Sequence, residues 1–297
     1  MFKGVLSPVI TVVDEQGKID CSGNEILIHY LVNKGLDGLL FFGTMGEFFA
    51  FTHEEKKEFI RFAVRTVNKR TPVLIGTGGT VIEEAMELTQ LAEQEGADGV
   101  VVISPYYFKL DEDSLYRYFA AIAESTSLPV MLYNFPDRTN VNLSPELVLK
   151  LAKDFSNIIG IKDTVDSISH TRRLIEVVKS ECPDFSVLAG FDEYLVPNLL
   201  AGGDGVLCGL TNIVPEIFTQ IMASYRSGDF ERVQTEQRRI GILMNIYNVS
   251  QPFVPAIKQA VKLRGLAISP YAKKPAGMLD DSQINQIKAL FRQANIE

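Results

Sequence analysis

Cysteine and histidine are scarce in this chain of 297 residues, and the few present are scattered along it. The three cysteines, Cys21, Cys182 and Cys208, are odd in number and form no pair at the spacing of a zinc site. Neither a disulfide framework nor a cysteine-based metal site is therefore indicated. The three histidines are equally far apart, so we expect no metal site at all. This cysteine usage is typical of a reducing compartment, and we expect a cytoplasmic protein.

A surplus of positive charge and a long apolar run are also lacking. Lys and Arg number 29 against 37 Asp and Glu, which gives a net charge of −8. This balance argues against a nucleic-acid or membrane-surface partner, but it leaves room for a small anionic substrate. No apolar run approaches the ~20 residues that span a bilayer. The first run, 4–13, has one basic residue close before it and no small-residue cleavage site, so we expect a strand rather than a signal peptide.

What the sequence does contain is a regular alternation of short apolar runs with amphipathic stretches. Eight runs are predicted to be strands: 4–13, 38–43, 72–76, 99–104, 129–134, 158–162, 185–190 and 205–209. Helical spacing marks segments between them: 54–67, 83–95, 115–124, 145–153 and 171–179. Eight strands alternating with helices predict an α/β fold, the (β/α)8 TIM barrel, with a doubly wound open sheet as the alternative.

The end of the chain is predicted to be helical. Segment 215–225 follows the eighth strand as its helix, and further helices are expected at 231–247, 254–263 and 282–294, broken by Pro252, Pro255 and Gly265. We therefore divide the chain into a barrel, 1–227, and a C-terminal helical domain, 228–297. No linker is long or polar enough to make this domain independent of the barrel.

Lys162 stands at the end of the apolar, β-branched run 158–161, which is typical of a strand buried on both faces. An ammonium group is costly to bury unless it is paired, so a buried lysine tends to become a neutral amine that can attack a carbonyl carbon. This is the chemistry of a Schiff-base enzyme. The alternative is that Lys162 ends the strand with its stem packed and its ammonium in water.

Polar residues follow several other strands, at the barrel end where the chemistry of this fold lies. Glycines on either side of Thr44 would let backbone amides approach a carboxylate, although a tight turn would need them equally. Tyr133 ends the strand before that of Lys162, so the two side chains would share a cavity, where a phenol can relay protons during imine chemistry. Alone, such a tyrosine is more often a core residue. The stretch 76–79 lacks the third glycine of a dinucleotide fingerprint, so no such cofactor is expected.

Taken together, four motifs resemble those of the dihydrodipicolinate synthase and N-acetylneuraminate lyase family. They are Gly43-Thr44-Met45-Gly46-Glu47, Tyr106-Tyr107, Leu132-Tyr133-Asn134-Phe135-Pro136 and Gly160-Ile161-Lys162-Asp163. The resemblance covers essentially the whole chain. It implies a TIM barrel with a C-terminal helical domain, usually a homotetramer built as a dimer of dimers. It also implies a class I mechanism in which a 2-keto acid forms an imine on the lysine, without metal or organic cofactor.

The resemblance assigns roles to individual residues. Lys162 matches the imine-forming lysine, and Tyr133 the tyrosine that shuttles protons. Thr44 matches the threonine that links this tyrosine to a second one, and Tyr107 matches that second tyrosine, which in the synthases reaches in from a neighbouring subunit.

For the substrate, the amides around Thr44 and Met45 would bind the carboxylate, and Gly190 and Leu207 match positions that line the pyruvate pocket. Arg138 matches the synthase arginine that holds the carboxylate of aspartate semialdehyde.

Two cues conflict over the reaction. Met45 replaces the threonine of most members, and several longer stretches resemble the 2-keto-3-deoxygluconate aldolase branch. Arg138 instead favours a synthase, unless it holds the distal hydroxyls of a sugar acid or serves a structural ion pair. We give the longer stretches more weight and expect a lyase that cleaves a 2-keto-3-deoxy sugar acid into pyruvate and an aldehyde. The alternatives are 4-hydroxy-tetrahydrodipicolinate synthase, a sugar-acid dehydratase and a non-catalytic ligand-binding barrel.

Overall fold

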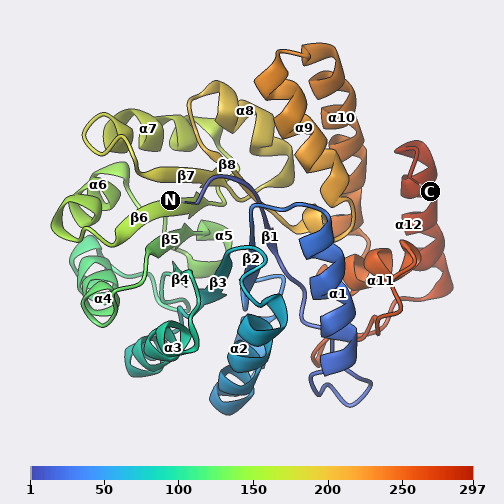
Figure 1. Cartoon of the computed structure of the whole chain (residues 1–297), viewed down its shortest axis with the longest axis horizontal. Coiled ribbons are helices and arrows are strands. Elements are labelled where there is room, and N and C mark those ends of the chain that lie inside the picture. Colours follow the sequence, from blue (N-terminus) through green and yellow to red (C-terminus); the bar gives the residue numbers. More distant parts are fainter. Residues whose placement is uncertain (1, 297) are drawn as a thin grey trace.

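In the computed structural model, which describes residues 2–296, eight parallel strands close into a barrel in sequence order (Figure 1). The strands are β1 Gly4–Pro8, β2 Gly38–Phe41, β3 Val73–Gly76, β4 Gly99–Ile103, β5 Val130–Asn134, β6 Ile158–Asp163, β7 Ser186–Ala189 and β8 Gly205–Leu207. Closure is explicit in β1, where Leu6 pairs with Gly38 of β2 on one side and with Leu207 of β8 on the other. The predicted TIM barrel is confirmed, and the open sheet is excluded.

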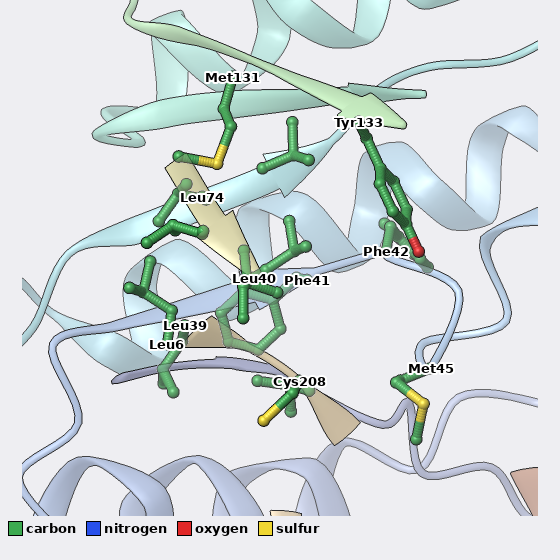
Figure 2. Packing of buried hydrophobic residues seen from close by; sticks show 14 of the residues in the cluster. Leu6, Leu39, Leu40, Phe41, Phe42, Met45, Leu74, Met131, Tyr133 and Cys208 are labelled. Carbon is green, nitrogen blue, oxygen red and sulfur yellow. The ribbon is translucent and has the colours of Figure 1, made fainter. Parts of the chain in front are cut away.

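Both faces of the strands are covered, which is why they appear in the sequence as continuous apolar runs. Every residue of β1, β4 and β5 is buried. Figure 2 shows Leu6, Leu40, Leu74 and Met131 packed among the strands, with Tyr133 and Met45 toward the ends of the strands. The barrel interior is thus a packed core with its polar side chains at one mouth, as expected for this fold.

Most helices of the barrel lie outside the strands, whereas the single turn of α5, Pro136–Thr139, lines a cavity at the barrel mouth. The barrel helices are α1 Cys21–Asn33, α2 His53–Val67, α3 Ile82–Glu95, α4 Glu112–Glu124, α5 Pro136–Thr139, α6 Pro145–Asp154, α7 Ile168–Lys179, α8 Leu195–Leu200 and α9 Pro215–Ser227. The capping signals in the sequence act as expected. Thr52 and Glu55 form a reciprocal capping box at α2, and the Ser144 hydroxyl accepts the Leu147 N–H at α6.

The first predicted strand is too long, because β1 ends at Pro8 although the buried apolar run continues to Val13. Beyond Val9 the backbone leaves the ladder and its amides find side-chain partners instead. The Ile10 N–H donates to Asn212 Oδ1 and the Val12 N–H to Asn24 Oδ1. Since buried side chains satisfy these amides, a loop can be as apolar as a strand.

The C-terminal segment packs against α9, at one side of the barrel (Figure 1). It consists of α10 Phe230–Leu243, a 3-10 helix Met244–Asn248, α11 Val254–Leu263 and α12 Asp281–Gln293. The predicted helix 231–247 is therefore two elements. The expectation that Pro255 breaks a helix is wrong. Pro255 occupies the first turn of α11, where no intrahelical N–H is needed. No helix within residues 2–296 combines the length and the apolar character needed to cross a bilayer.

Candidate active site

Lys162 lies inside the barrel mouth, beside Tyr133. Lys162 is the penultimate residue of β6, which continues to Asp163, and it is only 3 % exposed. Tyr133 of β5 and Lys162 are direct partners in the parallel ladder. The amine nitrogen lies 4.3 Å from the centre of the tyrosine ring. The interpretation of Lys162 as a strand-end residue with its ammonium in water is therefore wrong, because the strand carries it into an enclosed site.

Tyr133 directs its hydroxyl to Thr44 rather than into the core. The two hydroxyl oxygens are 3.1 Å apart, and either can donate. The tyrosine ring stacks on Phe135, with 5.9 Å between ring centres. This packing fixes the ring and leaves the phenolic oxygen between Thr44 and the cavity, a suitable position for a proton relay.

The loop after β2 lines the cavity at the barrel mouth and contains two unpaired backbone amides. It is a tight turn in which the Gly46 N–H donates to the Gly43 carbonyl and the Glu47 N–H to the Thr44 carbonyl. The N–H groups of Thr44 and Met45 make no hydrogen bond within residues 2–296. The glycines therefore serve a turn, and that turn leaves two donors free for an anion.

A cavity of about 530 Å³ surrounds these groups. Its lining includes six of the eight predicted site residues: Thr44, Met45, Tyr133, Arg138, Lys162 and Gly190. Gly190 is required by its surroundings, since a Cβ there would lie 1.8 Å from Thr164 Oγ1. Gly76, at the start of the glycine-rich stretch 76–79, has a similar explanation, because a Cβ there would lie 2.1 Å from the Phe42 carbonyl oxygen.

Leu207 and Tyr107 are not among the lining residues of this cavity. Leu207 is fully buried in β8, and the cavity is instead reached by Gly209, just beyond that strand. Tyr107 is 86 % exposed and packs edge-on against Phe108, with 5.1 Å between ring centres. Its predicted role in a neighbouring subunit's site stays a prediction.

Arg138 also lines the cavity and is not held by a carboxylate. Its guanidinium lies 5.3 Å from the centre of the Phe135 ring and donates to the Asp137 carbonyl at 3.4 Å. Among the described residues it forms no ion pair. A structural ion pair within the chain therefore does not explain Arg138, and its charge is available to a ligand.

A pair that the sequence did not predict, the buried Asp192 and the half-buried Tyr247, completes the inner wall. The Tyr247 hydroxyl donates to Asp192 Oδ2 at 2.8 Å, and the Leu210 N–H donates to Oδ1 at 2.7 Å. Burial raises the pKa of Asp192, although these donors oppose it. Burial and the adjacent Asp192 charge raise the pKa of Tyr247 well above its ordinary value. Asp192 follows β7 closely, so the strand-end rule could have found it, whereas Tyr247 comes from the C-terminal segment.

The outer wall of the cavity is polar and comes largely from the same segment. Its polar side chains are Glu193, Asn245, Asn248 and Gln251. Within residues 2–296, the side chains of Glu193, Asn248 and Gln251 make no hydrogen bond. These carboxylate and amide groups are therefore free to bind a polar ligand.

Behind the sheet, Asp163 anchors the strand next to Lys162. Its Oδ1 accepts from Asn134 Nδ2 at 2.9 Å, and its Oδ2 accepts from Thr171 at 2.8 Å and faces His170 Nδ1 at 3.1 Å. The other ring nitrogen of His170 faces the Leu143 carbonyl at 3.1 Å. Burial lowers the pKa of His170, but the hydrogen bond and charge of Asp163, together with the hydrogen bond to the Leu143 carbonyl, raise it, and the net shift is upward. Both ring nitrogens face acceptors, which the imidazolium form satisfies.

Comparison with known proteins decides the family. The model of the dihydrodipicolinate synthetase family matches residues 1–294. The chain belongs to this family. Its members are lyases, so the chain is a lyase of the dihydrodipicolinate synthetase family, as the strand-end motifs predicted. No group of three or more His, Cys, Asp or Glu residues that could bind a metal occurs among the residues that the structure describes.

Relatives named for each of the two leading predicted activities are similar to this chain. YagE of Escherichia coli (strain K12), provisionally named a 2-dehydro-3-deoxy-D-gluconate aldolase, is 44% identical over 100% of this chain and 98% of its own. A 4-hydroxy-tetrahydrodipicolinate synthase of Methanoculleus marisnigri is 36% identical over 98% of this chain and 99% of its own. The crystal structure of YagE in complex with pyruvate matches with a TM-score of 0.98 at 43% identity, covering 100% of both chains.

Proposed function

We propose that this protein is a Schiff-base-forming, pyruvate-dependent lyase that cleaves a 2-keto-3-deoxy sugar acid, such as 2-keto-3-deoxygluconate, into pyruvate and an aldehyde. The observation that supports it most is the buried Lys162 amine 4.3 Å from the Tyr133 ring, with the phenol hydrogen-bonded to Thr44. The pyruvate bound in the YagE structure and the provisional name of YagE support the same reaction class.

The reaction begins when the neutral Lys162 amine attacks the keto carbon of the substrate. Tyr133 passes protons to the carbinolamine oxygen, which leaves as water, and a protonated imine remains on Lys162. Tyr133 then accepts the proton of the C4 hydroxyl while the C3–C4 bond breaks. The bond's electrons move to the imine and form an enamine, and the aldehyde leaves. Protonation of the enamine at C3 and hydrolysis release pyruvate, so the imine itself is the electron acceptor and no cofactor is proposed.

The carboxylate next to the keto group is held by the loop after β2. The free N–H groups of Thr44 and Met45 are its proposed donors, because no protein acceptor within residues 2–296 competes for them. Met45 offers no hydroxyl, so this anchor depends on the backbone more than it would with threonine.

The polyhydroxy aldehyde half is proposed to bind the outer wall. Unpaired carboxylate and amide side chains, from Glu193, Asn248 and Gln251, match hydroxyl groups, which both donate and accept. Arg138, which also lines the cavity, favours a second candidate, 4-hydroxy-tetrahydrodipicolinate synthase, because a guanidinium without an ion-pair partner can bind the carboxylate of aspartate semialdehyde.

We also propose that the homotetramer expected from the family completes the relay with Tyr107. Thr44 borders a second cavity, of about 430 Å³, which is lined mainly by apolar residues that include Phe48, Tyr106 and Phe253. The exposed Tyr107 of a neighbouring subunit is the proposed occupant. Sedimentation would test the assembly, and Tyr107→Phe should slow turnover without dissociating it.

Borohydride reduction in the presence of pyruvate tests the imine. It should add the mass of reduced pyruvate to the peptide that contains Lys162, and Lys162→Ala should abolish this while leaving the circular dichroism spectrum unchanged. Lys150→Ala, a substitution in α6, is the matched control and should react like the wild type. A wild-type chain that stays unmodified would contradict the proposal.

The two activities are separated by assay. Pyruvate release from 2-keto-3-deoxygluconate should exceed condensation of pyruvate with aspartate semialdehyde. Turnover of only the second pair of substrates would establish the synthase instead.

A further inference from the structure

A fully buried ion pair links the C-terminal segment to the loop after β2. Lys258, in α11, has no exposed surface, and its Nζ lies 2.5 Å from Glu47 Oε2. The same ammonium donates to the Tyr271 carbonyl at 2.9 Å. The other carboxylate oxygen of Glu47, Oε1, accepts the Lys273 N–H at 2.8 Å. Both oxygens of this barrel side chain are therefore held by residues of the C-terminal segment.

Glu47 is only two residues after Met45 and belongs to the same turn. Its φ of 54° is left-handed, a conformation that a residue other than glycine adopts at some cost. Its N–H closes the turn on the Thr44 carbonyl at 3.1 Å, and the carbonyl of the preceding Gly46 accepts the Thr11 hydroxyl at 3.0 Å. The side-chain contacts of Glu47 thus hold the turn that contains the free Thr44 and Met45 amides.

Stability is a weak reason for such a pair. Desolvation of two charges largely cancels their attraction, and apolar residues of similar volume are often as stable or more so. Burial lowers the pKa of Lys258, while the Glu47 charge acts in the opposite direction. What an ion pair supplies that apolar packing does not is a fixed direction, because ammonium and carboxylate must meet at hydrogen-bond distance.

We propose that Lys258 and Glu47 are positioning residues, which act through the turn at residues 43–47 to aim the Thr44 and Met45 amides at the substrate carboxylate. This inference rests on the proposed function, since it assumes that a 2-keto acid binds next to Lys162. The C-terminal segment then shapes the anchor for the reacting half of the substrate as well as the outer wall for the aldehyde half.

The test compares three variants: Lys258→Met, Glu47→Gln and the double variant Glu47→Gln/Lys258→Met. Lys258→Met leaves an unpaired buried carboxylate and should lower both stability and pyruvate binding. The double variant removes both charges, so its melting temperature should recover toward the wild type. Its pyruvate binding should not recover. The pyruvate concentration for half-maximal borohydride trapping should stay raised about tenfold to a hundredfold, as expected for a misplacement near 1 Å.

Steady-state kinetics should likewise show an effect on substrate binding rather than on the chemical step. KM for the keto acid should rise more than kcat falls, because the Lys162 and Tyr133 pair is untouched. Glu47→Gln alone keeps the shape and the acceptor for the Lys273 N–H, so it should fold and show a smaller rise in the same direction. If the double variant fails to fold, Glu47→Gln provides the test instead. An unchanged trapping curve for Glu47→Gln would then overturn the proposal.

Lys179→Met is the matched control. Lys179 pairs with Asp204 at 2.6 Å, and both side chains are mostly buried. This pair lies at the N-terminal ends of the strands, so its loss should lower the melting temperature without shifting the trapping curve. A double variant that folds and traps pyruvate like the wild type would refute the positioning role. A wild type that traps no pyruvate would refute the proposed function instead.

Discussion

The proton relay through the hydroxyls of Tyr133 and Thr44 can be tested by removing each hydroxyl in turn, because the two losses should slow the reaction by different amounts. Tyr133→Phe removes the phenol that moves protons, and general acid–base catalysis contributes about 10² to 10⁴ in rate. Thr44→Val removes only the hydroxyl 3.1 Å from it. One neutral hydrogen bond has a net worth of about 0.5–1.5 kcal/mol, which corresponds to a loss of roughly twofold to tenfold. Tyr133→Phe should therefore be slower than Thr44→Val by at least about tenfold.

The double variant provides the sharper result. If Thr44 acts through the phenol, it has nothing left to orient in Tyr133→Phe, so adding Thr44→Val should slow turnover little further. Single-turnover pyruvate release, measured with each variant saturated by substrate, isolates the chemical step. Losses that multiply in the double variant would show that the two residues act independently. A Tyr133→Phe enzyme within a few-fold of the wild type would remove the phenol from the mechanism.

Three further outcomes are expected. Protonated His170 should stabilise the fold fully at pH values below its ordinary pKa of about 6.5, and this stabilisation should be lost as the pH rises through the raised pKa of the folded state. The urea midpoint of the wild type should therefore fall over this pH range, whereas that of His170→Gln should not. Met45→Thr should lower the pyruvate concentration for half-maximal trapping about threefold to tenfold, since it adds a donor near the carboxylate. Tyr247→Phe leaves Asp192 Oδ2 without its donor and should cost about 1–3 kcal/mol in denaturant unfolding.

The part of the site that the sequence predicts is the part made by the strands. Parallel strands that follow one another in a barrel are neighbours, so a tyrosine and a lysine at the ends of consecutive apolar runs must meet. Tyr133 and Lys162 are indeed ladder partners. The loop residue Thr44 follows by the same rule, because all strand ends share one mouth. Leu207 was less predictable, since the sequence does not show where β8 ends.

The part that the sequence does not predict is made by contacts between distant segments. Tyr247 and Asp192 are 55 residues apart, and Lys258 and Glu47 are 211 apart. The amphipathic pattern of α11 shows which face is buried but not what that face meets. A lysine such as Lys258 on the buried side of a helix was a visible signal, because a buried ammonium needs a partner, but nothing in the spacing names Glu47 as that partner.

The strands and the C-terminal segment supply different functional groups to the site. The strands supply the amine and the phenol, which any reaction through a pyruvate imine requires. The C-terminal segment supplies Tyr247 and the unpaired amides of the outer wall, to which the proposed mechanism assigns no step at the imine. Under that mechanism, changes in these amides alter which aldehyde is bound while leaving the imine chemistry intact. The Lys258 and Glu47 contact limits this freedom, because a shift of α11 would also move the turn proposed to hold the carboxylate.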